Sequence, residues 1–174
     1  MSGKPKVLIY GYGNPGRLDD GLGPALAENV QELASDGISI DSDYQLTVED
    51  ADLVAGHDVA IFADADVAGP EPFHFTRIPA AANISFSTHS IRADSLLALA
   101  KQIYGRDVEG YYLGLRGYEF NEFEERLSKL ALENLTAATA FIKELMRSGE
   151  FAQAAEQYGA PEHLWPAPET EEQK

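Results

Sequence analysis

The sequence of 174 residues contains no cysteine. Disulfide bonds, thiolate zinc sites and cysteine nucleophiles are therefore excluded, and a metal could bind only carboxylate, imidazole, amide or backbone groups. Basic residues are also scarce: 13 lysines and arginines accompany 29 aspartates and glutamates, for a formal net charge of -16. Such a charge repels nucleic acid and anionic membranes and attracts cations or basic peptides, although acidity also simply favours solubility.

Long apolar runs are missing as well. No stretch is long enough to span a bilayer, and the polar residues 1–6 do not resemble a signal peptide. We therefore expect a cytoplasmic protein with no membrane partner and no nucleic-acid partner. The length favours one domain with a sizeable core. We expect this domain to span residues 1–147, followed by an acidic, proline-containing tail at 148–174, and the protein to be a monomer.

Short apolar runs alternate with amphipathic segments along the chain. This alternation predicts βαβ units and an α/β fold, a three-layer αβα sandwich with a twisted, mostly parallel sheet of about five strands. The predicted strands are residues 7–10, 38–46, 59–63, 73–78 and 111–115. The predicted helices are residues 20–33, 48–54, 91–104 and 151–158, with a long helix that begins between 121 and 128 and continues to 145. Ligands of such folds bind at the carboxyl ends of the strands.

The first predicted strand runs into a glycine-rich segment. Residues 11–16 read Gly-Tyr-Gly-Asn-Pro-Gly, which matches the G-x-G-x-x-G pattern of dinucleotide-binding proteins, with Asp41 or Asp43 available as the acid for the ribose. Two aspartates, Asp19 and Asp20, stand at the start of the following helix, where they would repel a phosphate, and Pro15 lacks an N–H donor. We therefore expect no nucleotide here, and a nucleotide-dependent enzyme remains an alternative.

Three residues have positions typical of a functional site. Asp20 follows the glycine-rich segment, Asp64 ends a wholly apolar run, and His89 precedes a predicted helix, whose N-terminus would keep the imidazole neutral and able to bind a metal. Each residue also has a structural explanation, since Asp20 could cap a helix, Asp64 could form a turn and His89 could be a loop residue. Of the adjacent Asp19 and Asp20, we expect one to cap the helix and the other to face a cleft.

Three motifs together resemble those of the [NiFe]-hydrogenase maturation proteases, in the same order and at similar separations, over about residues 5–146. They are Gly11-Tyr12-Gly13-Asn14 with Asp19-Asp20-Gly21-Leu22-Gly23, then Ile61-Phe62-Ala63-Asp64-Ala65, then Thr88-His89 before a leucine-rich helix. The resemblance implies that Asp20, Asp64 and His89 are the metal-binding and catalytic residues, with Asp20 in place of the family's more common glutamate. One departure is the segment 117–128, which lacks the family's proline and its glycine before Leu127 and Ser128.

The resemblance implies an aspartic-type endopeptidase that activates a hydrogenase by removing the C-terminal extension of its large-subunit precursor. The nickel would already be held by the precursor and would not be permanently bound by the protease. Two carboxylates and one imidazole bind nickel more weakly than several histidines or thiolates would, which suits a metal delivered by the substrate. The same residues would also serve a second hypothesis, a nickel-sensing chaperone that holds the precursor without cutting it.

Overall fold

A mixed sheet of five strands forms the middle layer of the computed structural model, which describes residues 3–79, 81, 84 and 90–160. The strand order is β2-β1-β3-β5-β4, and every neighbouring pair is parallel except the edge strand β4, which is antiparallel to β5. The strands are β1 (Val7–Tyr12), β2 (Ile38–Asp43), β3 (Val59–Asp66), β4 (Phe73–Ile78) and β5 (Glu109–Arg116).

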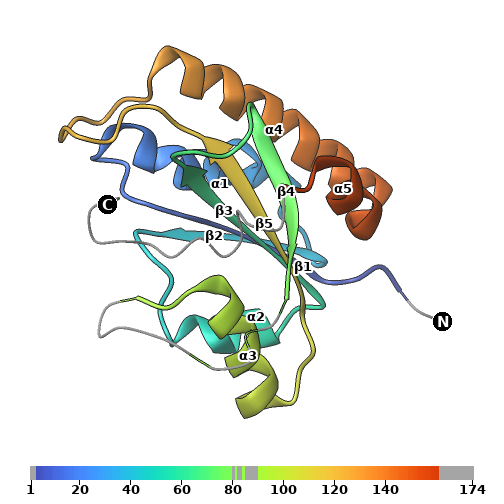
Figure 1. Ribbon diagram of the computed structural model, residues 1–174. Coiled ribbons are helices and arrows are strands. Elements are labelled where there is room, and N and C mark those ends of the chain that lie inside the picture. The colour runs from blue at the N-terminus through green and yellow to red at the C-terminus, as the bar shows by residue number, and fades with distance from the viewer. Residues whose placement is uncertain (1–2, 80, 82–83, 85–89, 161–174) are drawn as a thin grey trace.

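Helices cover both faces of this sheet, which confirms the predicted three-layer α/β fold. In Figure 1, α1 and α4 lie on one face, α2 and α3 lie on the other, and α5 packs beside β4. The α-helices are α1 (Leu22–Asn29), α2 (Asp50–Ala55), α3 (Ala93–Tyr104), α4 (Lys129–Ser148) and α5 (Phe151–Tyr158). Within the described part of the chain, no helix is both long enough and apolar enough to cross a bilayer.

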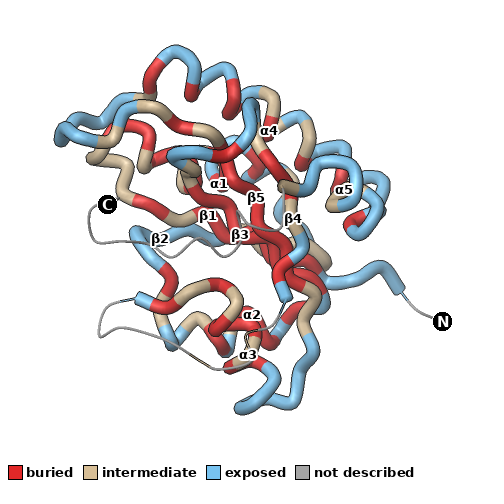
Figure 2. Tube along the Cα trace, in the orientation of Figure 1, coloured by how far each residue is buried: buried red, intermediate tan, exposed pale blue. Residues whose placement is uncertain are grey.

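The central strands are buried on both faces, as Figure 2 shows. Successive side chains of a strand point to opposite faces. Ile9 accordingly belongs to the core beneath α1 and α4, whereas its neighbours Leu8 and Tyr10 belong to the core beneath α2 and α3. In β3, residues 59–63 are apolar and buried, so the first polar side chain of that strand is Asp64, near its carboxyl end.

Several predicted boundaries are wrong, each for a local reason. The predicted helix at 20–33 is a 3-10 turn (Leu18–Gly21), α1 and a second 3-10 turn (Gln31–Leu33), because glycines and a proline crowd its first half. The strand β2 ends at Asp43, where the carboxylates of Asp41 and Asp43 accept hydrogen bonds from the next amide along the chain. The long helix α4 begins after Ser128, whose hydroxyl oxygen caps it by accepting from the amide of Ala131 at 3.3 Å.

The short helix α5 has its predicted bounds, and its first residue, Phe151, is buried in the core beneath α4. The amide of Ala160 donates to Thr76 Oγ1 of β4 at 2.9 Å. These contacts attach residues 151–160 to the sheet. The division of the chain at residue 147 remains a prediction, and Trp165 lies outside the described residues.

Helix α1 touches the sheet backbone to backbone. A Cβ atom on Gly23 would lie 2.3 Å from the carbonyl oxygen of Tyr12 and 2.5 Å from that of Ala63. A Cβ atom on Gly11 would lie 2.0 Å from the carbonyl oxygen of Gly23. Only glycine permits this approach. The first turn of α1, and with it residues 18–21, is therefore held directly against the carboxyl ends of β1 and β3.

Substitution of Gly23 by alanine should consequently destabilise the protein. Real Cβ atoms do not approach a backbone oxygen so closely, so α1 would have to move away from both strands. We expect the free energy of unfolding to fall by about 2 kcal/mol or more, as for other overpacked cores. Urea denaturation measures this change. The matched control is Gly37→Ala, because a Cβ atom there has nothing within 4 Å; equal stability of the two variants would contradict the close packing.

Candidate active site

The adjacent aspartates Asp19 and Asp20 have different surroundings. Asp19 is 0% exposed. Its Oδ1 accepts from the amide of Ser128 at 2.8 Å, and its Oδ2 accepts from the amides of Tyr118 at 2.8 Å and Glu119 at 3.0 Å and from the Ser128 hydroxyl at 2.7 Å. Asp19 thus ties the 3-10 turn to the segment between β5 and α4. Neither aspartate caps α1 through its side chain, so the predicted helix cap is wrong.

Asp20 is partly exposed and lies over the end of β1. Its Oδ2 accepts from the amide of Asn14 at 2.8 Å. A Cβ atom on Gly13 would lie 2.0 Å from the backbone oxygen of Asp20, and Gly13 has a φ of 139°, which L side chains rarely adopt. The glycine at position 13 therefore lets the 3-10 turn close down on the end of β1 and sets the position of the Asp20 carboxylate.

The amides of the glycine-rich segment are already used within the protein. Gly13 donates to the carbonyl of Asp43 at 3.1 Å, Asn14 donates to Asp20, and Gly16 donates to Asn14 Oδ1 at 2.9 Å. A pyrophosphate bound to such a segment needs free amide donors, and the proline at position 15 supplies none. The glycines serve backbone packing here, which supports the expectation that no nucleotide binds.

Asp64 occupies the same edge of the sheet. Gly11 of β1 pairs with Ala63 of β3, so Asp64 lies level with the end of β1, over which Asp20 is placed. Asp64 is 6% exposed, and the hydroxyl of Tyr112 donates to its Oδ2 at 3.3 Å. A buried carboxylate is costly unless donors or a cation compensate its charge. The two aspartates therefore share the carboxyl edge at which α/β folds bind ligands.

His89, the third expected site residue, lies outside the described residues. Among the residues that the structure does describe, no three histidine or carboxylate side chains are grouped as metal ligands. A complete ligand set that contains Asp20 and Asp64 would thus need a residue from elsewhere in the chain or from a substrate. The convergence of Asp20, Asp64 and His89 in one cleft stays a prediction.

Next to Asp64 lies a hydrogen-bonded chain that the sequence analysis missed. His74 is 1% exposed, and its Nε2 lies 2.9 Å from Asp66 Oδ2 while its Nδ1 lies 2.8 Å from Thr76 Oγ1. Burial alone raises the pKa of Asp66, but the hydrogen bonds from His74 and from the amides of Ala68 and Gly69 outweigh it, so the pKa lies below its ordinary value. The available signal was the alternation of His74 and Thr76 in β4, which puts both on the face of Asp64.

This hydroxyl, imidazole and carboxylate share the composition of a serine-protease-type triad but not its accessibility. The imidazole is buried, and the Thr76 oxygen already accepts from the amide of Ala160. A nucleophile must reach its substrate. The chain from Thr76 to Asp66 is therefore structural.

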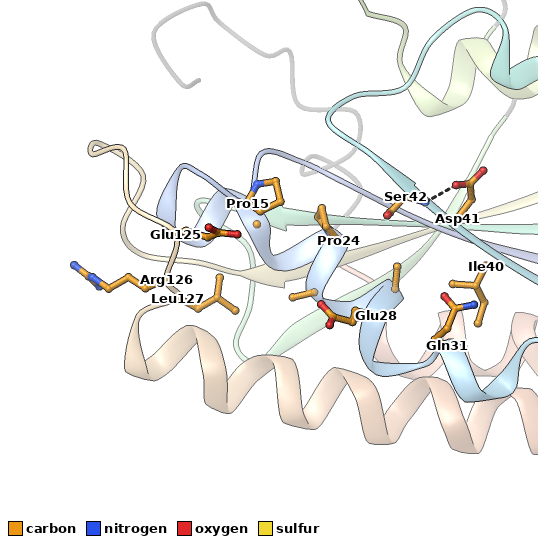
Figure 3. A pocket seen from close by; sticks show the side chains of 13 residues that line it. Pro15, Pro24, Glu28, Gln31, Ile40, Asp41, Ser42, Glu125, Arg126 and Leu127 are labelled. Atoms are coloured by element: carbon orange, nitrogen blue, oxygen red, sulfur yellow. Dashed lines mark hydrogen bonds between the residues drawn. The ribbon is translucent and has the colours of Figure 1, made fainter.

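A cavity of about 480 Å³ lies between α1, β2 and the segment before α4 (Figure 3). Ile40, one of its lining residues, belongs to the core face opposite to that of Asp64, so this cavity is not where Asp64 lies. Pro15 and Gly21 also line it, and both belong to the segment that positions Asp20. The cavity thus begins beside the candidate site and continues along the edge strand β2.

The sequence matches no protein-family model and no curated protein. Solved structures do match the fold. The [NiFe] hydrogenase maturation protease HycI from Thermococcus kodakarensis is similar with a TM-score of 0.66 and 25% identity, over 84% of this chain and 95% of that one. The hydrogenase maturating endopeptidase HybD from E. coli has a TM-score of 0.61 and 20% identity, over 83% and 94%. A hydrogenase 2 maturation peptidase from a Thaumarchaeota archaeon has a TM-score of 0.58 and 20% identity, over 81% and 97%.

These matches define the class as α/β proteins with a five-stranded, mostly parallel sheet. Within that class, the structures that this chain resembles include several [NiFe]-hydrogenase maturation proteases, as its three motifs predicted. In each of the three comparisons the match spans nearly the whole of the neighbour's chain, so the likeness concerns the complete fold.

The different surroundings of Asp19 and Asp20 give a testable contrast in stability. In Asp19→Asn an amide would replace a carboxylate oxygen and face buried donors, because each oxygen of Asp19 accepts at least one N–H. We expect this variant to lose about 3 kcal/mol in the free energy of unfolding. Asp20→Asn should change stability little, because Asp20 is partly exposed and, among the residues that the structure describes, its side chain accepts only from the amide of Asn14. Parallel urea titrations decide the matter; an equal loss in both variants would show that Asp19 is not the anchor.

Proposed function

We propose that this protein is an endopeptidase that removes the C-terminal extension of a nickel-loaded [NiFe]-hydrogenase large-subunit precursor. The observation that carries the proposal is the likeness to HycI from Thermococcus kodakarensis, which covers 84% of this chain and 95% of that protease. The fold and the three sequence motifs agree in pointing to this family, although either could occur alone by chance.

We assign the recognition of nickel to Asp20, Asp64 and His89. Asp20 and Asp64 lie at the same edge of the sheet, which supports this assignment. The different surroundings of the adjacent Asp19 and Asp20 also support it. Asp19 is fully buried and engaged by four donors, so it is not accessible to a metal held by a substrate, whereas Asp20 is partly exposed. Asp64 is the one acid in an otherwise apolar part of β3, where packing alone would not favour a charge.

The chemistry follows from the charges at this edge. Two carboxylates at the same edge of the sheet repel each other, and a cation brought by the substrate would relieve that repulsion. Carboxylate and imidazole ligands leave coordination positions for groups of the precursor and for water. The nickel held by the precursor would polarise the scissile carbonyl or activate the attacking water, and the protease residues would fix the bond beside it.

Asp64→Asn should abolish processing without unfolding the protein. The substitution keeps the size of the side chain but removes the charge that we assign to nickel recognition. We expect the cleavage rate of a nickel-loaded precursor to fall by about a hundredfold or more. Mass spectrometry of the precursor measures the cleavage, and circular dichroism checks the fold. The control is Asp52→Asn on the exposed surface of α2. Full activity of the Asp64 variant would remove Asp64 from the site.

The source of the metal gives a second functional prediction. The purified protein should contain no stoichiometric metal, because two carboxylates and one imidazole bind a free ion only modestly. It should nevertheless cut a nickel-loaded precursor and leave a nickel-free precursor intact. Metal analysis and parallel digests test both statements. One tightly bound zinc per chain, or equal cutting of the two precursors, would refute them. Binding of the loaded precursor with no cleavage would instead favour a nickel-sensing chaperone.

A further inference from the structure

The face of the sheet that carries Asp64 holds a row of neighbours across three strands. Gly114 of β5 pairs with Asp64 of β3 on one side and with His74 of β4 on the other. Two residues earlier in β5, Tyr112 pairs with both Phe62 and Thr76 in the same way. Residues at alternate positions share a face, so Asp64, His74 and Tyr112 lie on the same side of the sheet.

The missing side chain of Gly114 makes room for this group. A Cβ atom there would lie 2.3 Å from Nε2 of His74 and 2.9 Å from Cε1 of Tyr112. The imidazole and the phenol ring therefore fill the space above Gly114, with ring centroids 5.4 Å apart and an interplanar angle of 42°. Such tilted pairs of aromatic rings are mutually attractive.

The imidazole of His74 is itself fixed at both nitrogens. The carboxylate of Asp66 can only accept, so Nε2 carries the proton that it donates. In the neutral imidazole Nδ1 then accepts from the hydroxyl of Thr76, whose oxygen accepts from the amide of Ala160. A chain of hydrogen bonds from Ala160, just after α5, across β4 to β3 thus holds the ring against which Tyr112 packs.

We propose that Tyr112 is a positioning residue for Asp64: its hydroxyl, which donates to Asp64 Oδ2 at 3.3 Å, sets the orientation of that carboxylate toward the cation, and His74 holds the Tyr112 ring in place. This inference rests on the function proposed above. A hydrogen bond to one oxygen of a ligating carboxylate limits the rotation of that carboxylate and so fixes the direction in which it meets a cation. Tyr112 acts through Asp64 and touches neither the precursor nor the scissile bond in this role.

The adjacent tyrosines of β5 provide a matched pair of variants. Tyr112→Phe removes the hydroxyl that reaches Asp64 and keeps the ring. Tyr111→Phe removes a hydroxyl on the opposite face of the same strand, where it donates to Glu109. With a nickel-loaded precursor, we expect Tyr112→Phe to lower kcat about tenfold or more with little change in KM, and Tyr111→Phe to keep kcat. The thermal midpoints of both variants should stay close to that of the wild-type protein.

A second measurement does not depend on cleavage. Calorimetric titration with nickel chloride should give a dissociation constant about tenfold weaker for Tyr112→Phe than for Tyr111→Phe. Equal kcat and equal nickel affinity in the two variants would overturn the inference. A parallel loss of stability, kcat and substrate binding in Tyr112→Phe would also overturn it, because such a loss indicates a packing role. If the wild-type protein binds nickel but cuts no precursor, the proposed function fails and the titration alone decides the role of Tyr112. If it does neither, both proposals fall.

Discussion

The contact between the backbone of α1 and the carboxyl ends of β1 and β3 determines where the candidate site lies. Gly11 and Gly23 allow the helix to approach so closely that no Cβ atom would fit, and Gly13 allows the preceding 3-10 turn to close over the end of β1. This approach leaves Asp19 buried beneath the turn and Asp20 at its surface. Side chains in the interior of a protein are packed too densely for such a turn to shift without rearrangement of its neighbours.

The same glycine pattern explains why a nucleotide-binding motif and this segment look alike in sequence. In both cases glycines follow a first strand and precede a helix, because a strand and a helix must approach each other within a few residues. The difference lies in the backbone amides. A phosphate-binding segment leaves them free, whereas here Gly13, Asn14 and Gly16 donate to acceptors of the protein. The carboxylate of Asp20 accepts the hydrogen bond of the Asn14 amide. Asp20 therefore disfavours phosphate in two ways, by its negative charge and by occupying a donor that a phosphate would need.

Much of the fold could be predicted from the sequence, because apolar periodicity reports burial directly. The central strands and the existence of the long helix α4 followed from it. The broken first helix did not, since the effects of glycine and proline depend on the neighbours of each turn. In the site, the positions of Asp20 and Asp64 at strand ends were readable. The partners of Asp19 were not, because Tyr118, Glu119 and Ser128 lie about 100 residues away and a hydrogen bond to a backbone amide leaves no mark in the sequence. The pairing of His74 with Asp66 was missed for a related reason, since strand register decides it.

The acids at this edge differ in how their charge is compensated, and this difference gives the site its chemical character. Asp19 is satisfied by amide and hydroxyl donors, and Asp66 by His74 and two amides, so neither has a need for a cation. Asp20 receives one amide through Oδ2, and a tyrosine hydroxyl reaches Asp64. A carboxylate held by several donors contributes rigidity to the fold, and a buried carboxylate must have its charge compensated by donors or by a cation. The neighbours of Asp20 and Asp64 hold the two acids in place at the carboxyl edge of the sheet, and such fixed side chains are what a site for a cation requires.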